Sequence, residues 1–229
     1  MINSVTFRIF DFSENIFLIS FKEKNKTLNL TDFFFSLSKH LRTSKKWIEV
    51  VSGEDSLIIK YNISDITNTN AKKILENQLA EFTYQEQQKV TSILEVPICY
   101  SEEFGLDIQN LKIEKDLTIQ EIVGLHSSVT YKVKMIGFTP GFAYLGDLQS
   151  KLFVSRLSKP RVNLVPGSVG ISGNRTGIYA LGGPGGWRII GRTPLSLFKQ
   201  KKKNPFSILP SMEVKFKPIT TEEFESFSS

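Results

Sequence analysis

The stretch "TYKVKMIGFTPGFAYLG", residues 130–146, joins a strand-like run of alternating side chains to a segment that is both turn-rich and aromatic. Residues 137–146 combine three glycines and a proline with two phenylalanines and a tyrosine. Such a segment has too many turn formers for the interior of a strand or helix. The Thr-Pro-Gly tripeptide at 139–141 predicts a turn, because proline fixes φ and glycine accepts positive φ. We therefore expect the chain to leave a barrel strand and return, with Phe142 and Tyr144 at the rim of a groove.

The same pattern extends through the second half of the chain. Short apolar or alternating runs such as "SVGIS", "GIYAL", "WRIIG" and "MEVKF" are separated by glycine- and proline-rich turns. A short helix precedes them in "LTIQEIVGLHSS", where Thr118 and Glu121 have the spacing of a capping box. Many short strands with frequent turn signals predict a barrel or closed sheet.

The first half of the chain alternates extended and helical patterns. Residues 4–21 predict two strands, residues 30–42 a helix with Thr31 as its N-cap, residues 47–62 a hairpin, and residues 70–82 a second helix. This order favours an antiparallel sheet with helices on one face. The polar stretch "YQEQQKV" is the best linker candidate. We predict an α+β domain at residues 1–88 and a mainly-β domain at residues 89–229.

Composition limits the classes of function. The net charge of +6 is concentrated in "KQKKKN" at 199–204, which we interpret as a solvated hairpin tip rather than a nucleic-acid surface. The sequence has no apolar run long enough to span a membrane and no secretion-signal pattern. Its single cysteine, Cys99, cannot form an internal disulfide. We expect a cytoplasmic protein.

Motifs of established chemistry are mostly missing. The sequence has no P-loop, and "GGPGGW" has Arg188 where a dinucleotide fingerprint needs its third glycine. One cysteine and two distant histidines make no metal-ligand cluster. Ser168 does not stand in a nucleophile elbow, because Pro166 occupies the position of that motif's first glycine. A catalytic pair of Ser168 and His126 would form only if the fold brought the two side chains together.

What remains is a set of turns that carry aromatic and guanidinium groups. Glycines let backbone amides approach a ligand closely, and arginine binds a carboxylate or phosphate in a bidentate manner. Such turns can equally close the end of a barrel, so a structural role stays open for each residue. The candidate ligand-binding residues are Phe138, Pro140, Phe142, Tyr144, Arg161, Ser168, Trp187, Arg188 and Arg192.

These segments carry a resemblance to a known family. "GFTPGFAYLGDL", "PRVNLVPGSVGISGNRTGIYAL", "GGPGGWRIIGRTPLSLF" and "HSSVTYKV" resemble the family of the 5-oxoprolinase B subunit, also called allophanate hydrolase subunit 1, which includes the kinase inhibitor KipI. The resemblance implies an α+β domain followed by a cyclophilin-like β-barrel. It also implies two partners, the KipA-like C subunit and the A subunit of 5-oxoprolinase, with which the chain would use ATP to open the lactam 5-oxoproline to L-glutamate.

The resemblance further implies roles for individual residues. Arg161 and Arg192 match arginines of the family motifs that would hold a carboxylate or phosphoryl group, with Tyr144 and Trp187 beside the ring of the substrate. His126 matches a family histidine and is a general base or a structural residue. His126 and Arg192 are therefore the catalytic candidates.

Three alternatives to the 5-oxoprolinase role stay open. One is KipI-like inhibition of a sensor histidine kinase, and another is membership of an amide hydrolase that acts on allophanate or urea-related substrates. The third is a carboxylate-binding protein, because the sequence shows no nucleophile or metal site. Turn sequences such as "LVPGSVGI" differ from the usual family form, and we expect such changes to alter the shape of a loop without removing an ionisable group.

Overall fold

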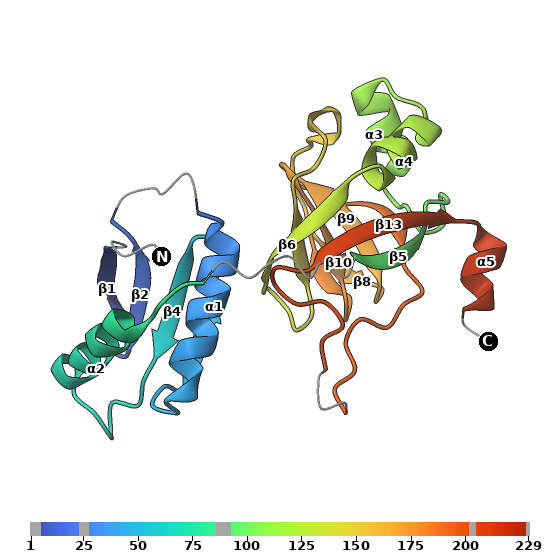
Figure 1. Ribbon diagram of the computed structural model, residues 1–229. Helices are drawn as coiled ribbons and strands as arrows, with labels where there is room; N and C mark the ends of the chain where they lie inside the picture. Colours follow the sequence, from blue (N-terminus) through green and yellow to red (C-terminus); the bar gives the residue numbers. More distant parts are fainter. Residues whose placement is uncertain (1–5, 23–27, 86–92, 202–204, 228–229) are drawn as a thin grey trace. The chain divides into compact units, whose positions relative to one another are not determined.

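The computed structural model describes residues 6–22, 28–85, 93–201 and 205–227. The chain forms two compact units, Met1–Val90 and Thr91–Ser229. The predicted linker lies largely outside the described residues, as does the predicted domain boundary. Each unit is described by itself below (Figure 1).

The N-terminal unit is a four-stranded antiparallel sheet with two helices. The strand order is β1-β2-β4-β3, and the elements are β1 (Phe7–Ser13), β2 (Ile16–Phe21), α1 (Leu30–Thr43), β3 (Glu49–Ser52), β4 (Ser56–Lys60) and α2 (Asn68–Glu81). The N-cap of α1 is Asn29 rather than the predicted Thr31, because the Asn29 side chain accepts a hydrogen bond from the Asp32 backbone N–H. Thr31 is instead buried.

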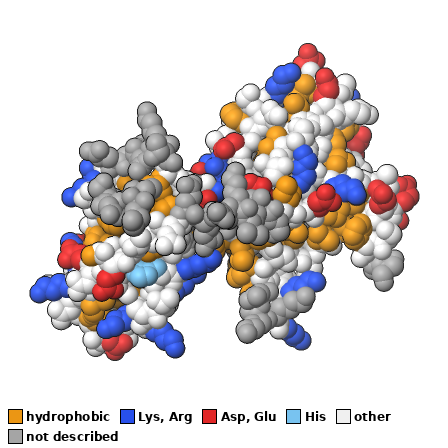
Figure 2. Space-filling model, viewed as in Figure 1, with side chains coloured by type: hydrophobic (Ala, Val, Ile, Leu, Met, Phe, Trp, Pro, Cys, Tyr) orange, Lys and Arg blue, Asp and Glu red, His pale blue; other side chains and the backbone are white. Residues whose placement is uncertain are grey.

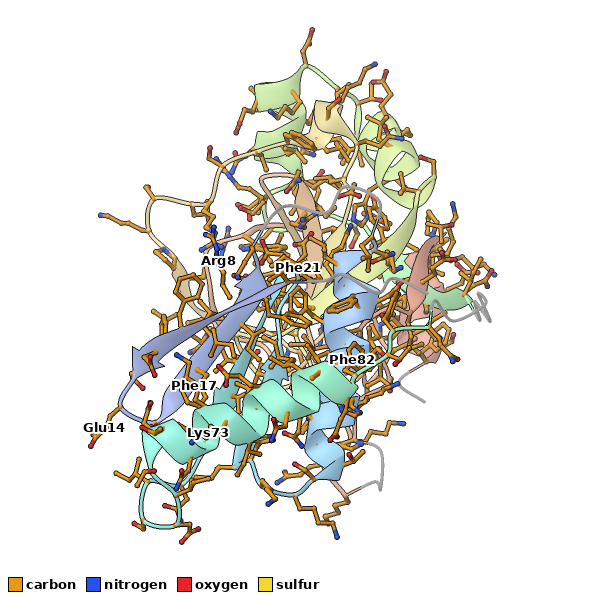
Figure 3. The ribbon with its side chains drawn as sticks, turned by 60° about the vertical axis from the view of Figure 1, so that its left-hand side comes forward. Arg8, Glu14, Phe17, Phe21, Lys73 and Phe82 are labelled. Carbon is orange, nitrogen blue, oxygen red and sulfur yellow. The ribbon has the colours of Figure 1, made fainter. Side chains whose placement is uncertain are left out.

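One face of this sheet holds the core of the unit. Phe17 and Ile19 of β2 are paired in register with Ile59 and Leu57 of β4, and all four are fully buried under the two helices. Figure 3 shows Phe17 on the sheet and Phe82 at the end of α2, on the side where the apolar residues pack. The alternation of buried and exposed residues along the strands therefore places both helices on one face, as predicted.

The C-terminal unit is a closed seven-stranded barrel with the strand order β10-β7-β6-β13-β5-β12-β9. Its strands are β5 (Ile93–Cys99), β6 (Thr130–Ile136), β7 (Ala143–Gly146), β9 (Ser168–Ser172), β10 (Arg175–Tyr179), β12 (Arg188–Arg192) and β13 (Glu213–Ile219). A separate two-stranded sheet pairs β8 (Arg161–Leu164) with β11 (Gly183–Gly185). The predicted fold class is confirmed: an α+β unit is followed by a mainly-β barrel.

Short helices accompany the barrel. They are α3 (Ile108–Lys115), α4 (Ile119–Ser127), the single 3₁₀ turn η1 (Ser150–Leu152) and α5 (Thr221–Ser226). The predicted capping box of α4 is present, since Thr118 and Glu121 exchange both hydrogen bonds. β5 and β13 are the first and the last strands of the barrel along the chain, and they pair with each other in parallel.

The surface carries charges of both signs. On the face shown in Figure 2, Lys and Arg side chains are interspersed with Asp and Glu side chains. The lysine cluster at 199–204 is flanked by a hairpin-like pairing of Phe198 with Phe206, and the Lys199 N–H bonds to the Pro205 carbonyl. Residues 202–204 lie outside the described residues.

Within the described part of the chain, none of the helices has both the length and the apolar character needed to cross a membrane.

Candidate functional site

The turn at 139–142 joins two barrel strands. Phe142 N–H donates to the Thr139 carbonyl at 3.0 Å, with Pro140 and Gly141 in the central positions and Gly141 at φ +78°. This is a type II turn, which takes proline at its second position and needs positive φ at its third. The predicted turn between β6 and β7 is confirmed, and Pro140 is exposed at its tip.

Phe138 lies beside this turn in an unusual conformation. It has a positive φ of 66°, and its side chain is 60% exposed. Its ring meets those of Phe142 and Tyr179 edge-on, with centroids 5.7 Å and 6.4 Å apart. A non-glycine residue in the left-handed region costs about 1–2 kcal/mol. The fold therefore holds a large apolar ring at the surface at some cost in stability.

Phe142 is a core residue rather than a rim residue. Its side chain is only 1% exposed, and it packs with Leu164, Tyr179, Trp187 and Ile189 in a cluster that is separate from the main barrel core. The predicted position of Phe142 at a rim is therefore wrong, because its ring packs inward against Gly177 of β10, where an added Cβ would come within 2.9 Å of the ring. Trp187 is also buried, and the centroids of the Trp187 and Phe142 rings lie 5.4 Å apart.

Tyr144 lies at the margin of this aromatic cluster. It is half-buried, and the centroid of its ring lies 4.7 Å from that of Phe142 and 5.7 Å from that of Trp187. Burial raises the pKa of Tyr144, and the positive charge of Arg156 opposes this rise. The cluster thus has a buried base and a polar margin formed by a tyrosine hydroxyl.

Arg161 is committed to a carboxylate of the protein. Its guanidinium donates two hydrogen bonds of 2.8 Å to the two oxygens of Asp107. The Asp107 side chain is 1% exposed and also accepts the Ile189 backbone N–H at 2.7 Å. This bidentate pair joins β8 to the start of α3 and to β12. The geometry favours a structural role for Arg161, since its donors already face Asp107.

Arg188 and Arg192 have different surroundings. Arg188 donates a hydrogen bond of 3.3 Å from Nη2 to the Glu114 carboxylate and one of 3.4 Å from Nε to the Ser155 carbonyl. Arg192 donates its Nε–H to the Pro166 carbonyl at 2.9 Å and lies against the rings of Phe104 and Phe224. Among the described residues, no ion pair is found for Arg192. Its cation is held by aromatic faces, which leaves part of the guanidinium available to an anion.

Ser168 is a structural residue by its contacts. Its side chain is 2% exposed, and its hydroxyl donates to the Val165 carbonyl at 2.7 Å. This bond, within the loop that precedes β9, engages the hydroxyl proton in the turn. The two ring nitrogens of His126 bond to other residues, so the structure does not bring Ser168 and His126 together as a catalytic pair.

His126 is fully buried inside the barrel unit. Its Nδ1 lies 2.7 Å from the Tyr100 hydroxyl and its Nε2 lies 2.8 Å from the Thr176 hydroxyl. The Thr176 hydroxyl donates to the Gly170 carbonyl, so it accepts from Nε2–H, and Nδ1 accepts from Tyr100. The ring also stacks on Phe216, with centroids 4.6 Å apart. Burial lowers the pKa of His126 to about 3. This geometry favours the structural alternative over the general-base one.

Three residues of these networks were not identified from the sequence. Asp107 stands in the apolar context "GLDI", which signals a buried acid, whereas Tyr100 and Thr176 carry no local signal. Asp147 also forms two ion pairs. Its Oδ1 lies 2.8 Å from Arg175 Nη1, and its Oδ2 lies 3.5 Å from Lys134 Nζ.

In the part of the chain that the structure describes, no group of three or more His, Cys, Asp or Glu residues could hold a metal ion.

Comparison with known proteins identifies the family. The family described as "Carboxyltransferase domain, subdomain C and D" matches residues 7–208. The 5-oxoprolinase B subunit of Bacillus subtilis is 32% identical over 191 residues, covering 79% of both chains. The protein of the same name from Escherichia coli is 34% identical over 182 residues, covering 80% of this chain and 83% of that one.

Comparison with solved structures shows that the fold is shared. An uncharacterised protein of Pyrococcus horikoshii is 35% identical, with a TM-score of 0.56 over 95% of this chain and 100% of that chain. The urea amidolyase of Kluyveromyces lactis is 19% identical, with a TM-score of 0.76 over 99% of this chain but only 16% of that chain, and shows a shared fold. The chain therefore belongs to the family of the carboxyltransferase domain, subdomain C and D, in which its curated relatives include the B subunits of 5-oxoprolinases.

Proposed function

We propose that this chain is the B subunit of a 5-oxoprolinase and acts on 5-oxoproline only within an assembly that contains the partner A and C subunits. The observation that carries the proposal is the similarity to three proteins named as 5-oxoprolinase B subunits, at 32%, 34% and 33% identity over about four fifths of the chain. We further propose that the assembly works in the cytoplasm and uses ATP.

The chemistry explains why a single chain of this kind would need partners. Amide resonance makes direct attack of water on a lactam carbonyl slow, so the carbonyl must be activated and the developing charge stabilised by cationic donors. In this chain the hydroxyl of Ser168 and the ring of His126 are both buried and engaged. We infer that this chain holds and orients the substrate, and that its partners supply the ATP-dependent activation.

The experiment reconstitutes the chain with its native A and C subunits. Glutamate formation and ATP hydrolysis are measured with 5-oxoproline, omitting each of the three chains in turn. We expect turnover only when all three are present. A folded and assembled complex without turnover would contradict the proposed function. Inhibition of a sensor histidine kinase, or activity on a urea-related substrate, would then be the hypotheses to test.

The same assay tests the predicted catalytic role of Arg192. Arg192→Ala removes the guanidinium, whereas Phe224→Ala disturbs the same stack and leaves the cation in place. If Arg192 stabilises charge in the reaction, Arg192→Ala lowers kcat by about 100-fold or more, and Phe224→Ala does not. Equal losses in the two variants would show that Arg192 only holds α5 against the barrel.

A further inference from the structure

The N-terminal sheet has a second face, on the side away from its two helices. Along each strand, residues that pack in the core alternate with residues that point the other way. In β1, for example, Phe7 and Ile9 pack against the core, so Arg8 and Phe10 lie on the other face. This open face consists of Arg8, Phe10, Phe12, Ile16, Leu18, Ser20, Glu49, Val51, Ser56, Ile58 and Lys60.

An unbroken row of apolar side chains crosses the open face. Phe10 of β1 pairs in register with Leu18 of β2, and Leu18 pairs with Ile58 of β4. Ile58 pairs in turn with Val51 of β3, so the row spans all four strands. Phe10 and Val51, at its two ends, are 45% and 47% exposed. The solvated face of an antiparallel sheet usually carries polar residues, and a contiguous exposed apolar patch marks an interaction site.

Two opposite charges lie at opposite corners of the open face. β1 and β3 are its edge strands, and they run in opposite directions. Arg8 stands two positions before Phe10, and Glu49 stands two positions before Val51, so the two charges lie on opposite sides of the apolar row. Among the described residues, no hydrogen bond or ion pair is found for either charged side chain. Lys60, the third charged residue of this face, stands beside Glu49 in register.

This arrangement of charges is complementary to itself. In an isologous dimer, a two-fold axis places the same surface of both copies face to face. Two sheets that pack with their strands near right angles adopt one of the preferred geometries for sheet packing. In that geometry the corner with Arg8 lies opposite the corner with Glu49 of the other copy, and the same contact forms again across the axis. The two apolar rows cross at the centre, where Leu18 and Ile58 of both copies meet.

We propose that the open face binds a second copy of this chain in a two-fold symmetric dimer, in which the apolar rows pack together and Arg8 pairs with Glu49 of the other copy. About eleven residues of each copy would take part, whereas a standard interface uses about 20–30. The dimer is therefore weak, with a Kd of about 1–100 μM. The proposal is independent of the proposed function, because it concerns the N-terminal unit and involves no substrate.

Sedimentation equilibrium of the full chain over about 1–500 μM, a range that brackets the expected Kd, measures dimerisation. Phe10→Ser removes an apolar side chain from the row, and Ile113→Ser is its control, because Ile113 is 78% exposed on α3 in the barrel unit. Arg8→Glu reverses a charge of the open face. Lys73→Glu is its control, since it makes the same change in net charge on the exposed side of α2, which covers the opposite face of the sheet (Figure 3).

We expect the wild-type chain to dimerise in this range. Phe10→Ser should weaken dimerisation by about 10- to 100-fold, because the two-fold axis removes the ring from the interface twice. Arg8→Glu should weaken it by about 10-fold, because two carboxylates then face each other at both contacts. Combining Arg8→Glu with Glu49→Arg restores opposite charges, and should bring the Kd to within about 3-fold of the wild-type value. Both control variants should dimerise like the wild type.

A wild-type chain that stays monomeric at the highest concentration overturns the proposal. A dimer that neither Phe10→Ser nor Arg8→Glu weakens also overturns it, as does a charge swap that restores nothing. If the wild type is monomeric and Phe10→Ser cannot join the reconstituted assembly, the open face binds a partner subunit instead of a second copy. Circular dichroism checks that each variant is folded. The charge variants keep the proposal testable even if Phe10→Ser fails to fold, since they change only exposed side chains.

Discussion

Removal of Arg161 should destabilise the barrel more than removal of the charge on Asp107. The reason is the unequal burial of the pair: the Asp107 side chain is 1% exposed and the Arg161 side chain is 29% exposed. Arg161→Met leaves a buried carboxylate whose one remaining hydrogen-bond donor, among the residues that the structure describes, is the Ile189 N–H. Breaking a buried ion pair from one side costs about 3–5 kcal/mol. Asp107→Asn leaves a cation that can reach water, and should cost about 1–3 kcal/mol.

The double variant gives the sharpest result. Combining Arg161→Met with Asp107→Asn removes the unpaired buried charge, so it should be more stable than Arg161→Met alone. The control is Glu114→Gln, which breaks the more exposed pair with Arg188, in which the Arg188 and Glu114 side chains are 22% and 42% exposed. That change should cost less than about 1 kcal/mol.

Urea unfolding followed by the fluorescence of Trp187 measures these differences. A Trp47→Phe background makes Trp187 the only tryptophan, so that the signal reports the barrel unit alone. A probe for one unit is needed because a chain with two compact units need not unfold in one step. The reasoning is refuted if the double variant is less stable than Arg161→Met, or if Asp107→Asn costs more than Arg161→Met.

Two further predictions concern the same unit. Because the pKa of His126 is lowered from 6.5 to about 3 by burial, acid favours the unfolded state, which binds the proton. The free energy of unfolding should fall by about 1.6 kcal/mol between about pH 6.5 and pH 5. Urea titrations should show this loss disappearing in His126→Gln and persisting in His40→Gln. A loss that survives in His126→Gln would contradict the assignment. Gly141→Ala should destabilise by about 1–2 kcal/mol because Gly141 has φ +78° and its added Cβ would lie 3.0 Å from Ala180. In contrast, Gly124→Ala in α4, where an added Cβ meets nothing within 4 Å, should stabilise by about 0.5–1 kcal/mol; thermal melting checks the pair, and equal shifts would refute the argument.

The sequence was sufficient for features that depend on local chemistry. The type II turn at 139–142 follows from Pro140 and Gly141, and the capping box of α4 from the spacing of Thr118 and Glu121. The exception is the start of α1, where Asn29 and Thr31 are both good N-caps. Choosing between two competent caps two residues apart depends on which side chain must be buried.

The candidate site could be predicted only in part, because its partners come from distant segments. Arg156 and Arg161 stand in the same segment, "SRLSKPR", and look alike in sequence. Asp107, 54 positions before Arg161, decides which of the two is neutralised. His126 is likewise fixed by Thr176, 50 positions later. Such pairings depend on strand register, which places residues on one face or the other.

The division between engaged and available groups suggests how this chain takes part in catalysis. Its buried histidine, its turn serine and its best-paired arginine are all engaged in internal hydrogen bonds. Leaving such a buried polar group without a partner costs free energy, so these residues cannot easily be lent to a substrate. The groups that remain available are the exposed ring of Phe138, the half-buried Tyr144 and the guanidinium of Arg192, which suit binding rather than bond breaking. The function proposed above requires partner subunits to supply the activated carbonyl, which is why the kinetic tests use the reconstituted assembly rather than the isolated chain.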